Sequence, residues 1–154
     1  MKILIVFYSR DGHTRKTAEI IANALNADID EIVDKKPRKG IIGFLRAGYD
    51  ATCGKITDIS FTKDPTKYDI VIIGSPVWNG RITPAIRTYL IKNKGKIKKC
   101  GFFVTCARGA GKCLNQMHKL CNSKVLVDKV FCRKDLANEI KTFVGELEKH
   151  IPSN

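Results

Sequence analysis

Uninterrupted apolar runs alternate along this chain with stretches in which apolar residues recur every three or four positions. The runs Ile3–Phe7, Ile70–Ile73 and Phe102–Val104 contain no polar residue, as expected of strands buried on both faces of a parallel sheet. The periodic stretches are typical of helices that cover such a sheet with one apolar side. The pattern predicts strands at 2–8, 29–33, 69–74, 100–105 and 125–130, and helices at 14–26, 84–92, 111–121 and 135–149. Thr83 is expected to cap the second of these helices, with Pro84 at its first position.

The composition of the strands predicts their order in the sheet. The strands at 29–33 and 125–130 mix apolar with charged residues, which suits sheet edges. With right-handed crossovers, the simplest arrangement is an α/β fold: a doubly wound five-stranded parallel sheet, order 2-1-3-4-5, with helices on both faces. The winding reverses between strands 1 and 3, so we expect a ligand outside their carboxyl ends.

Length and one irregular segment set the expected domain organisation. The 154 residues predict a single domain, 1–154. Residues 35–66 interrupt the alternation between the second and third strands, and we expect an insert there with a short helix within 40–49. The insert is either a lid beside the sheet edge or the site, or a segment that docks on a membrane surface or a partner.

Apolar runs and cysteine spacing bear on the compartment and on metal binding. No apolar run approaches the eighteen or so residues that cross a bilayer, and the N-terminus lacks the pattern of a signal peptide, so we expect a cytoplasmic protein. The six cysteines show no zinc or iron–sulfur spacing, which predicts reduced thiols and no metal site. Cys106 stands apart because it directly follows a predicted strand at the ligand edge.

The chain is strongly basic, with 28 Lys and Arg against 15 Asp and Glu and a formal net charge of +13. The excess gathers at 35–39 and 92–99. Such a surface attracts anions. The chain lacks an aromatic-basic RNA motif and a helix-turn-helix pattern, so we expect no specific nucleic-acid function. An acidic protein partner, an anionic membrane surface and a simple gain in solubility all fit the charge.

A short polar turn, Ser9–Thr14, joins the first apolar strand to the first helix. A helix that begins directly after such a turn points backbone N–H groups at whatever lies in the turn, which favours an anionic ligand. The alternative is an ordinary strand-to-helix turn in which Ser and Thr only cap the helix.

Two further turns end at the same predicted edge of the sheet. Ser75–Arg81 carries the only Trp of the chain, Trp78, beside Gly80, which favours an aromatic platform for a ligand. Thr105–Gly111 is rich in glycine, so its backbone can approach a planar ring closely. The three turns thus offer complementary contacts: one for a phosphate, one for an aromatic face and one for the edge of a planar ring.

These turns resemble those of the flavodoxins and flavodoxin-like FMN proteins. Family members hold the FMN phosphate with a loop of the form S/T-x-S/T-G-x-T, and here Ser9, Gly12 and Thr14 match it. The segment 74–80 is similar to the loop that places a residue such as Trp78 against the isoalloxazine, and 105–111 lies where a third loop holds the pyrimidine edge. The likeness covers most of the chain outside 35–66.

The resemblance implies FMN as the cofactor. The residues that it places at the cofactor are Ser9, Arg10, Gly12, His13, Thr14, Pro76, Val77, Trp78, Asn79, Gly80, Thr105, Ala107, Arg108 and Gly109. No acid, base or nucleophile is evident beside them, so no catalytic residue is predicted.

Asp11 departs from the family motif, because Ser or Thr is usual at its position and a carboxylate repels a phosphate unless it turns away. Ser9–Thr14 also resembles the opening of the menaquinone-dependent protoporphyrinogen oxidases, which have Arg-Asp-Gly in this turn. Pro76–Gly80 is more similar to the electron-transfer and reductase branches, and the long late insertion expected of the oxidases is not found.

The resemblance therefore implies an FMN-binding protein that shuttles electrons between redox partners. Since many flavodoxins are acidic, the basic surface predicts the reverse pairing: an acidic partner such as a ferredoxin-like donor or acceptor, docked on 35–46 or 92–99. The alternative is an FMN-dependent oxidoreductase of the NAD(P)H:quinone reductase or menaquinone-dependent protoporphyrinogen oxidase type.

Overall fold

A parallel sheet forms the centre of the molecule. The computed structural model describes residues 1–132 and 135–152, and within them five strands pair in the order β2-β1-β5-β6-β7. This confirms the doubly wound order predicted from the sequence. The strands are β1 (Ile3–Phe7), β2 (Asp28–Glu31), β5 (Ile70–Pro76), β6 (Lys99–Cys106) and β7 (Lys124–Cys132).

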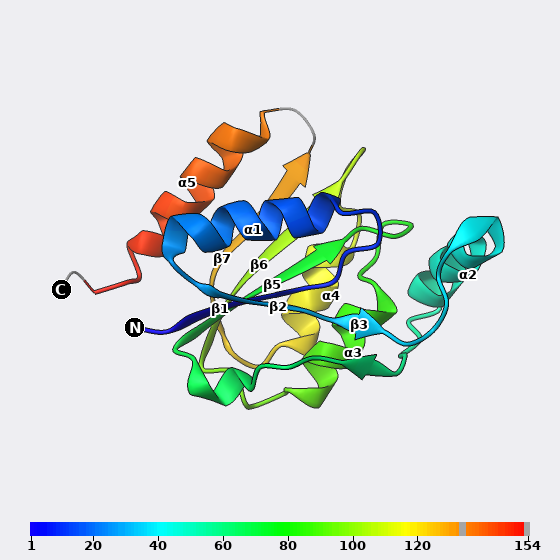
Figure 1. Ribbon diagram of the computed structural model, residues 1–154, viewed down its shortest axis with the longest axis horizontal. Helices are drawn as coiled ribbons and strands as arrows, with labels where there is room; N and C mark the ends of the chain where they lie inside the picture. Colours follow the sequence, from blue (N-terminus) through cyan, green and yellow to red (C-terminus); the bar gives the residue numbers. More distant parts are fainter. Residues whose placement is uncertain (133–134, 153–154) are drawn as a thin grey trace.

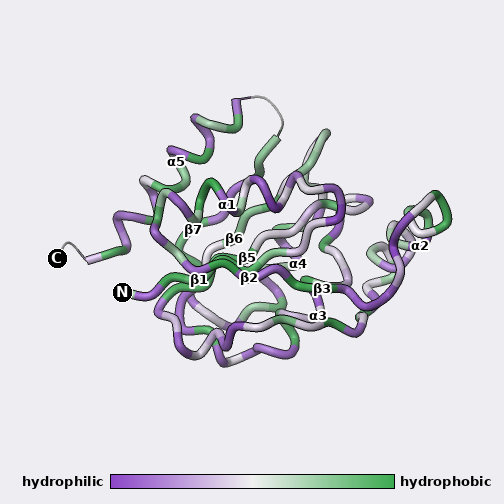
Figure 2. The backbone as a smooth tube through the Cα atoms, in the orientation of Figure 1, coloured by the Kyte–Doolittle hydropathy of each residue, from purple (hydrophilic) through white to green (hydrophobic). Residues whose placement is uncertain are grey.

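Helices cover both faces of the sheet, as predicted (Figure 1). They are α1 (His13–Leu25), α3 (Pro84–Lys92), α4 (Cys113–Leu120) and α5 (Leu136–Glu148). Side chains of β1 alternate between the two cores: Leu4 and Val6 belong to the core beneath α3 and α4, and Ile5 and Phe7 to the core beneath α1 and α5. Burial on both faces explains why this strand is apolar at every position. Figure 2 shows the apolar centre of the sheet.

Local capping explains where α3 begins. The hydroxyl of Thr83 accepts a hydrogen bond of 3.4 Å from the Ile86 N–H, and Pro84 occupies the first turn, where its missing N–H leaves no bond unmade. The predicted cap is confirmed. No helix in the described part of the chain is long and apolar enough to cross a membrane.

The segment between β2 and β5 holds more structure than the predicted short helix. Helix α2 runs over Gly40–Thr52, and a small antiparallel ribbon pairs β3 (Val33–Asp34) with β4 (Ile59–Ser60), followed by a 3-10 turn at Pro65–Lys67. The predicted strand 29–33 is wrong at its end, because β2 ends at Glu31 and Val33 pairs with β4 instead. Helix α2 lies apart from the layers, at one end of the molecule (Figure 1).

A close contact between β5 and β6 depends on glycine. A Cβ atom added at Gly74 would lie 2.1 Å from the Cζ atom of Phe103. The Phe103 ring is fully buried, and its centroid lies 6.0 Å from that of Phe131. The ring therefore has little room to give way.

We expect Gly74→Ala to destabilise the protein by roughly 1–3 kcal/mol, the usual effect of overpacking a core. Urea unfolding measures it. Gly145→Ala is the matched control, because a Cβ there meets nothing within 4 Å; in the interior of α5 it should stabilise by roughly 0.5–1 kcal/mol. Equal stability of the Gly74 variant and the wild type would show that the ring can move aside.

Candidate functional site

A cavity of about 400 Å³ opens at the carboxyl ends of the central strands. It lies at the predicted edge, where the winding of the sheet reverses. Its wall combines residues from the three predicted turns with residues from α1, α2, β7 and α5: Ser9, Arg10, Asp11, His13, Thr14, Lys16, Thr17, Phe44, Pro76, Val77, Trp78, Thr105, Cys106, Ala107, Phe131, Cys132 and Leu136.

The first turn has the geometry of an anion cradle. Gly12 adopts a left-handed conformation with φ 89°, and its N–H donates to the Ser9 hydroxyl at 3.1 Å. The first helical bond runs from Lys16 N–H to the Gly12 carbonyl at 3.0 Å, so the N–H groups of Thr14 and Arg15 have no carbonyl partner inside the helix. The first turn of α1 contains no acidic residue. The helix end therefore favours a negative charge.

A hydroxyl pair ties the first turn to the third. Thr14 Oγ1 lies 2.8 Å from Thr105 Oγ1, and Thr14 is almost wholly buried. The pair fixes the distance between the helix start and the end of β6. The polar turn and the glycine-rich turn thus form neighbouring walls of one cavity.

Trp78 is held by a tight hairpin turn. Trp78 and Arg81 exchange two backbone hydrogen bonds of 3.0 Å, and both residues between them, Asn79 at φ 50° and Gly80 at φ 71°, have positive φ. This combination is typical of a type I′ turn, for which Asn-Gly is the preferred sequence. The indole also meets the Tyr8 ring edge to face, with centroids 5.5 Å apart. Trp78 is therefore fixed in place at the cavity wall.

The second and third turns touch through their backbones. A Cβ atom at Gly111 would lie 2.6 Å from the Cα of Gly80, and the Lys112 N–H donates to the Gly80 carbonyl at 2.7 Å. Glycine at both positions allows this approach. The contact sets the start of α4 against the Trp78 turn.

Helix α2 closes the cavity from the side. Phe44 on α2 lines the wall, and the Arg10 guanidinium lies 5.1 Å from the centre of its ring. A second cavity of about 440 Å³ adjoins the first between α2 and the Trp78 turn, and the two share Arg10, Phe44, Val77 and Trp78. The position of α2 therefore fits a lid, one of the two roles expected for the insert.

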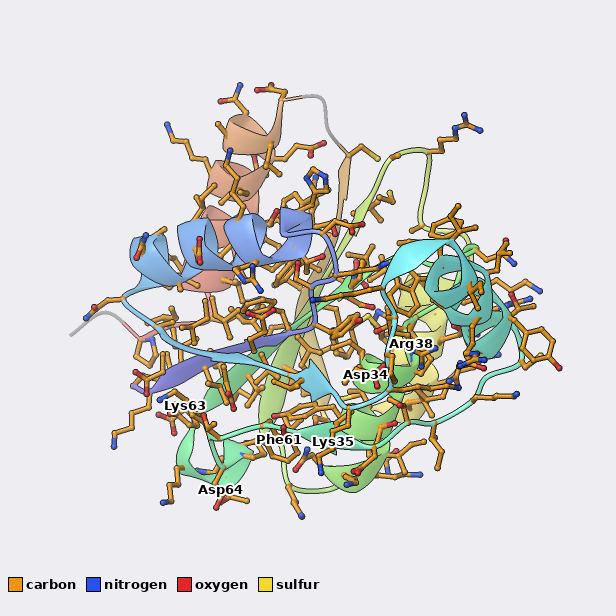
Figure 3. All side chains as sticks on the ribbon, turned by 45° about the vertical axis from the view of Figure 1, so that its right-hand side comes forward. Asp34, Lys35, Arg38, Phe61, Lys63 and Asp64 are labelled. Atoms are coloured by element: carbon orange, nitrogen blue, oxygen red, sulfur yellow. The ribbon has the colours of Figure 1, made fainter. Side chains whose placement is uncertain are left out.

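A buried group of charges, which we call the Arg38 cluster, anchors α2 to the ribbon. Arg38 donates to Asp34 from Nε at 3.0 Å and to Asp50 from Nη1 at 2.6 Å, and the side chains of all three are at most 5% exposed. Lys36 Nζ also donates to Asp50, at 2.6 Å. Figure 3 shows Asp34 and Arg38 side by side between the ribbon and α2. The Arg38 guanidinium also lies 5.8 Å from the Trp78 ring centre.

The Arg38 cluster changes the acidity of Asp50. Burial alone would raise the pKa of this carboxyl, but the hydrogen bonds from Lys36 and Arg38 outweigh burial and lower the pKa from 3.8 to about 2. Asp50 is therefore ionised at neutral pH, and its charge is matched where α2 meets the ribbon.

The structure brings most of the predicted cofactor residues together. Nine of them line the cavity: Ser9, Arg10, His13, Thr14, Pro76, Val77, Trp78, Thr105 and Ala107. Gly12 sits directly behind the wall as the N-cap of α1. Asn79 faces the second cavity, and its amide donates to Thr52 at 2.7 Å.

Three predicted residues lie elsewhere. Gly80 contacts Gly111, as described above, rather than the cavity wall. Arg108 and Gly109 are exposed beyond the wall. Burial and the hydrogen bond with Cys132 raise the pKa of the Cys106 thiol, and backbone hydrogen bonds from Gly109 and Arg108 oppose this rise.

Sequence reasoning missed one wall of the cavity. Phe131, Cys132 and Leu136 line it, but the predicted fifth strand ended at 130, whereas β7 continues to Cys132. The rule that all parallel strands end at one edge of the sheet would have predicted that the end of this strand also borders the site. Phe44 could not be placed, because nothing in the sequence fixes how the insert folds back over the site.

Comparisons with known proteins agree with this architecture. No family model matches the chain. A flavoprotein from Lactobacillus acidophilus, solved in complex with FMN, superposes with a TM-score of 0.75 at 24% identity, over 92% of this chain and 97% of that one. A candidate flavoprotein from Bacteroides eggerthii superposes with a TM-score of 0.75 at 23% identity, over 94% of this chain and 96% of that one. Oxidised flavodoxin 1 from Bacillus cereus superposes with a TM-score of 0.58 at 16% identity, over 99% of this chain and 100% of that one. The chain has the flavodoxin-like fold.

We expect Asp50→Asn to destabilise the protein by roughly 2 kcal/mol at neutral pH, since it removes the charge from hydrogen bonds to Arg38 and Lys36. A folded-state pKa lowered from 3.8 to about 2 gives stability that is complete above about pH 4 and is lost as the pH falls through about 2. The difference between wild type and variant should therefore shrink over this window in urea unfolding.

Asp58→Asn provides the control. Asp58 pairs with Lys35 at 3.2 Å, but both side chains are more than half exposed, so its loss should cost less than about 0.5 kcal/mol. A difference for Asp50→Asn that stays constant from pH 7 to pH 2 would contradict the role of its ionised form.

Proposed function

We propose that this chain binds FMN in the cavity at the carboxyl end of the sheet and transfers electrons between redox partners. One observation carries the proposal: a helix-start anion cradle, a fixed indole and the third turn all border one cavity of about 400 Å³. This volume is in the usual range for small-molecule sites.

The residues present fit the phosphate of FMN. Lys16 adds a positive charge to the wall beside the amides of the helix start. Asp11 also borders the cavity, but its side chain is 73% exposed and its Oδ1 lies 3.9 Å from Arg10 Nε. Water and Arg10 thus reduce its repulsion of a phosphate to about 1 kcal/mol or less.

The remaining wall suits a flavin ring. Trp78 offers an aromatic face, and Pro76, Val77 and Ala107 offer small apolar contacts. The flavoprotein from Lactobacillus acidophilus, which shares the fold, was solved with FMN. When bound, FMN supplies the redox chemistry. The chain holds the phosphate at the start of α1, orients the ring against Trp78 and shields it from water with Phe44.

A second candidate function is favoured by the adjoining cavity. About 440 Å³ in volume, it shares Phe44, Val77 and Trp78 with the first cavity and is otherwise lined mainly by α2. A planar substrate there would lie beside the flavin, as an FMN-dependent oxidoreductase acting on a quinone requires. Oxidation of NAD(P)H or a quinol at catalytic rates would identify this function; a carrier would instead cycle with a low-potential donor.

The partner surface that we propose is the outer side of α2. Ile41 and Ile42 are 82% and 75% exposed and line neither cavity, and Figure 2 shows apolar residues at the outer end of the helix. Phe44, Leu45 and Tyr49, which border the cavities, are also 60% to 65% exposed. Lys39 and Arg46 on the same segment are also exposed. An apolar patch with a basic rim beside the cofactor cavity suits an acidic redox protein.

The other lysine-rich region lies far from the cavity. Lys99 is the first residue of β6 and Cys106, at the cavity, is its last. Since a strand rises by about 3.3 Å per residue, the 92–99 region is roughly 20 Å from the cavity. Electron transfer requires proximity, so the proposed contact is 35–46 and not 92–99.

Titration with FMN tests the proposed cofactor. Because Trp78 is the only Trp, we expect FMN to quench its fluorescence as the flavin absorption bands shift. Thr14→Val should weaken FMN roughly tenfold, the effect of losing a hydrogen bond to a charged group, and should weaken riboflavin, which has no phosphate, much less, through the lost hydroxyl pair with Thr105 alone. Asp11→Ser should tighten FMN by a few-fold.

Thr142→Val is the control for this titration, because Thr142 lies exposed on α5 and bonds only the Asn138 carbonyl among the contacts of the described residues. It should leave the affinity unchanged. A colourless protein whose Trp fluorescence does not change when FMN is added would refute the proposed function.

Charge reversal tests the partner surface. Lys39→Glu with Arg46→Glu should slow reduction by an acidic ferredoxin-like donor by roughly tenfold at low salt, because it removes electrostatic steering. The rates of variant and wild type should converge at high salt. Lys94→Glu with Lys96→Glu, at the distant edge, is the matched control.

Equal slowing by both pairs of substitutions would assign the effect to net charge alone. Sedimentation of the protein with phosphatidylglycerol vesicles, abolished by Lys39→Glu with Arg46→Glu, would point instead to a membrane surface as the partner.

A further inference from the structure

Two cysteines meet in the wall of the cofactor cavity. Cys106 ends β6 and Cys132 ends β7, and the two residues are directly opposite in the register of these strands. Their Sγ atoms are 3.6 Å apart. Both are partly exposed free thiols, and both line the cavity.

The backbone already has the geometry for a bond between them. Neighbouring strands lie about 4.8 Å apart, which is within the range of Cα separations, about 4.4–6.8 Å, that a disulfide spans. The sulfur atoms need to approach by only about 1.5 Å to reach the length of an S–S bond. Side-chain rotation can supply this movement while the strands stay paired.

The third turn supports Cys106 as the reactive member. Burial and the hydrogen bond with Cys132 raise the pKa of the Cys106 thiol, while backbone hydrogen bonds from Gly109 and Arg108 oppose the rise. The Cys106 thiol is thus protonated at neutral pH. When a thiolate does form at Cys106, these two N–H groups stabilise it.

We propose that Cys106 and Cys132 are a redox-active thiol pair that cycles between dithiol and disulfide and exchanges electrons with the flavin beside it. This inference rests on the proposed binding of FMN. It assigns the chain a second two-electron centre in the same cavity, and a further activity toward low-molecular-weight disulfides.

Each step of the cycle balances. In oxidation, the Cys106 thiolate attacks a small disulfide and releases one thiol, and Cys132 then attacks the mixed disulfide at the Cys106 sulfur and releases the second. In reduction, the Cys106–Cys132 disulfide accepts two electrons and two protons, so its S–S bond breaks and two S–H bonds form. The two-electron-reduced flavin that supplies them is oxidised.

The chain contains its own comparison pair. Cys100 and Cys121 have Sγ atoms 3.3 Å apart, and the hydrogen bond with Cys100 lowers the pKa of Cys121 to about 6. Cys121 is therefore ionised more easily than Cys106, but its partner Cys100 lies near the start of β6, at the sheet edge opposite the cavity. It can form a disulfide without reaching the flavin. Proximity to the cofactor is therefore what distinguishes Cys106 and Cys132.

The first experiment needs no FMN. Apoprotein with Cys121→Ser, which removes the comparison pair, is equilibrated in a series of glutathione buffers, and its free thiols are alkylated and mapped by mass spectrometry. We expect two fewer free thiols and a linked Cys106–Cys132 peptide at the oxidising end, reversed at the reducing end. Adding Cys132→Ser should abolish the link. Both thiols free in every buffer would overturn the inference, whether or not FMN binds.

The second experiment measures electron uptake of the oxidised, FMN-loaded protein during anaerobic photoreduction. We expect the protein with the disulfide to take up two more electrons than the Cys132→Ser variant before its flavin is fully reduced. Alkylation after the reduction should then detect Cys106 and Cys132 as free thiols. Equal uptake with the disulfide intact would refute exchange with the flavin. Failure to bind FMN would refute the proposed function and this exchange together, while a disulfide mapped in the first experiment would still establish the thiol pair.

Discussion

Parallel pairing is the constraint on which the rest of this structure depends. Because β1, β5, β6 and β7 run in one direction, the turns that follow them emerge at one edge of the sheet. Residues as distant in sequence as Ser9 and Cys132 thereby become neighbours around one cavity. The central strands can be apolar along their buried middle parts because the polar groups of the site lie in the turns.

The position of helix α2 depends on a different interaction, the Arg38 cluster. Helix α2 exposes most of its large apolar side chains, so burial of apolar surface does little to hold it in place. Charge does more: Arg38 joins Asp34 of the ribbon to Asp50 of the helix. Breaking such a buried pair leaves a charge without compensation, which favours one position of α2. The hydrophobic surface of the helix remains available for a partner.

The features that could be predicted from the sequence are those that depend on residues close together in the chain. The strand order, the helices, the Thr83 cap and the first turn followed from apolar periodicity and from helix-start chemistry, which act within a few residues. The ribbon of β3 and β4 escaped prediction because two-residue strands carry no periodicity, and their pairing joins Asp34 to Ile59 across the insert. Phe44 and the Arg38 cluster depend on the same long-range folding. Cys132 was missed only because the end of β7 was placed two residues early.

The backbone contact between Gly80 and Gly111 couples the Trp78 turn to the start of α4, so that the two segments move together. The Lys112 N–H holds the Gly80 carbonyl, and α4 begins at the next residue, Cys113. A ligand that displaces the indole must therefore move the end of a helix as well, and packed helices shift between discrete positions and do not deform gradually. Occupancy of the cavity would then be transmitted to the face of the sheet covered by α3 and α4, far from any atom of the ligand.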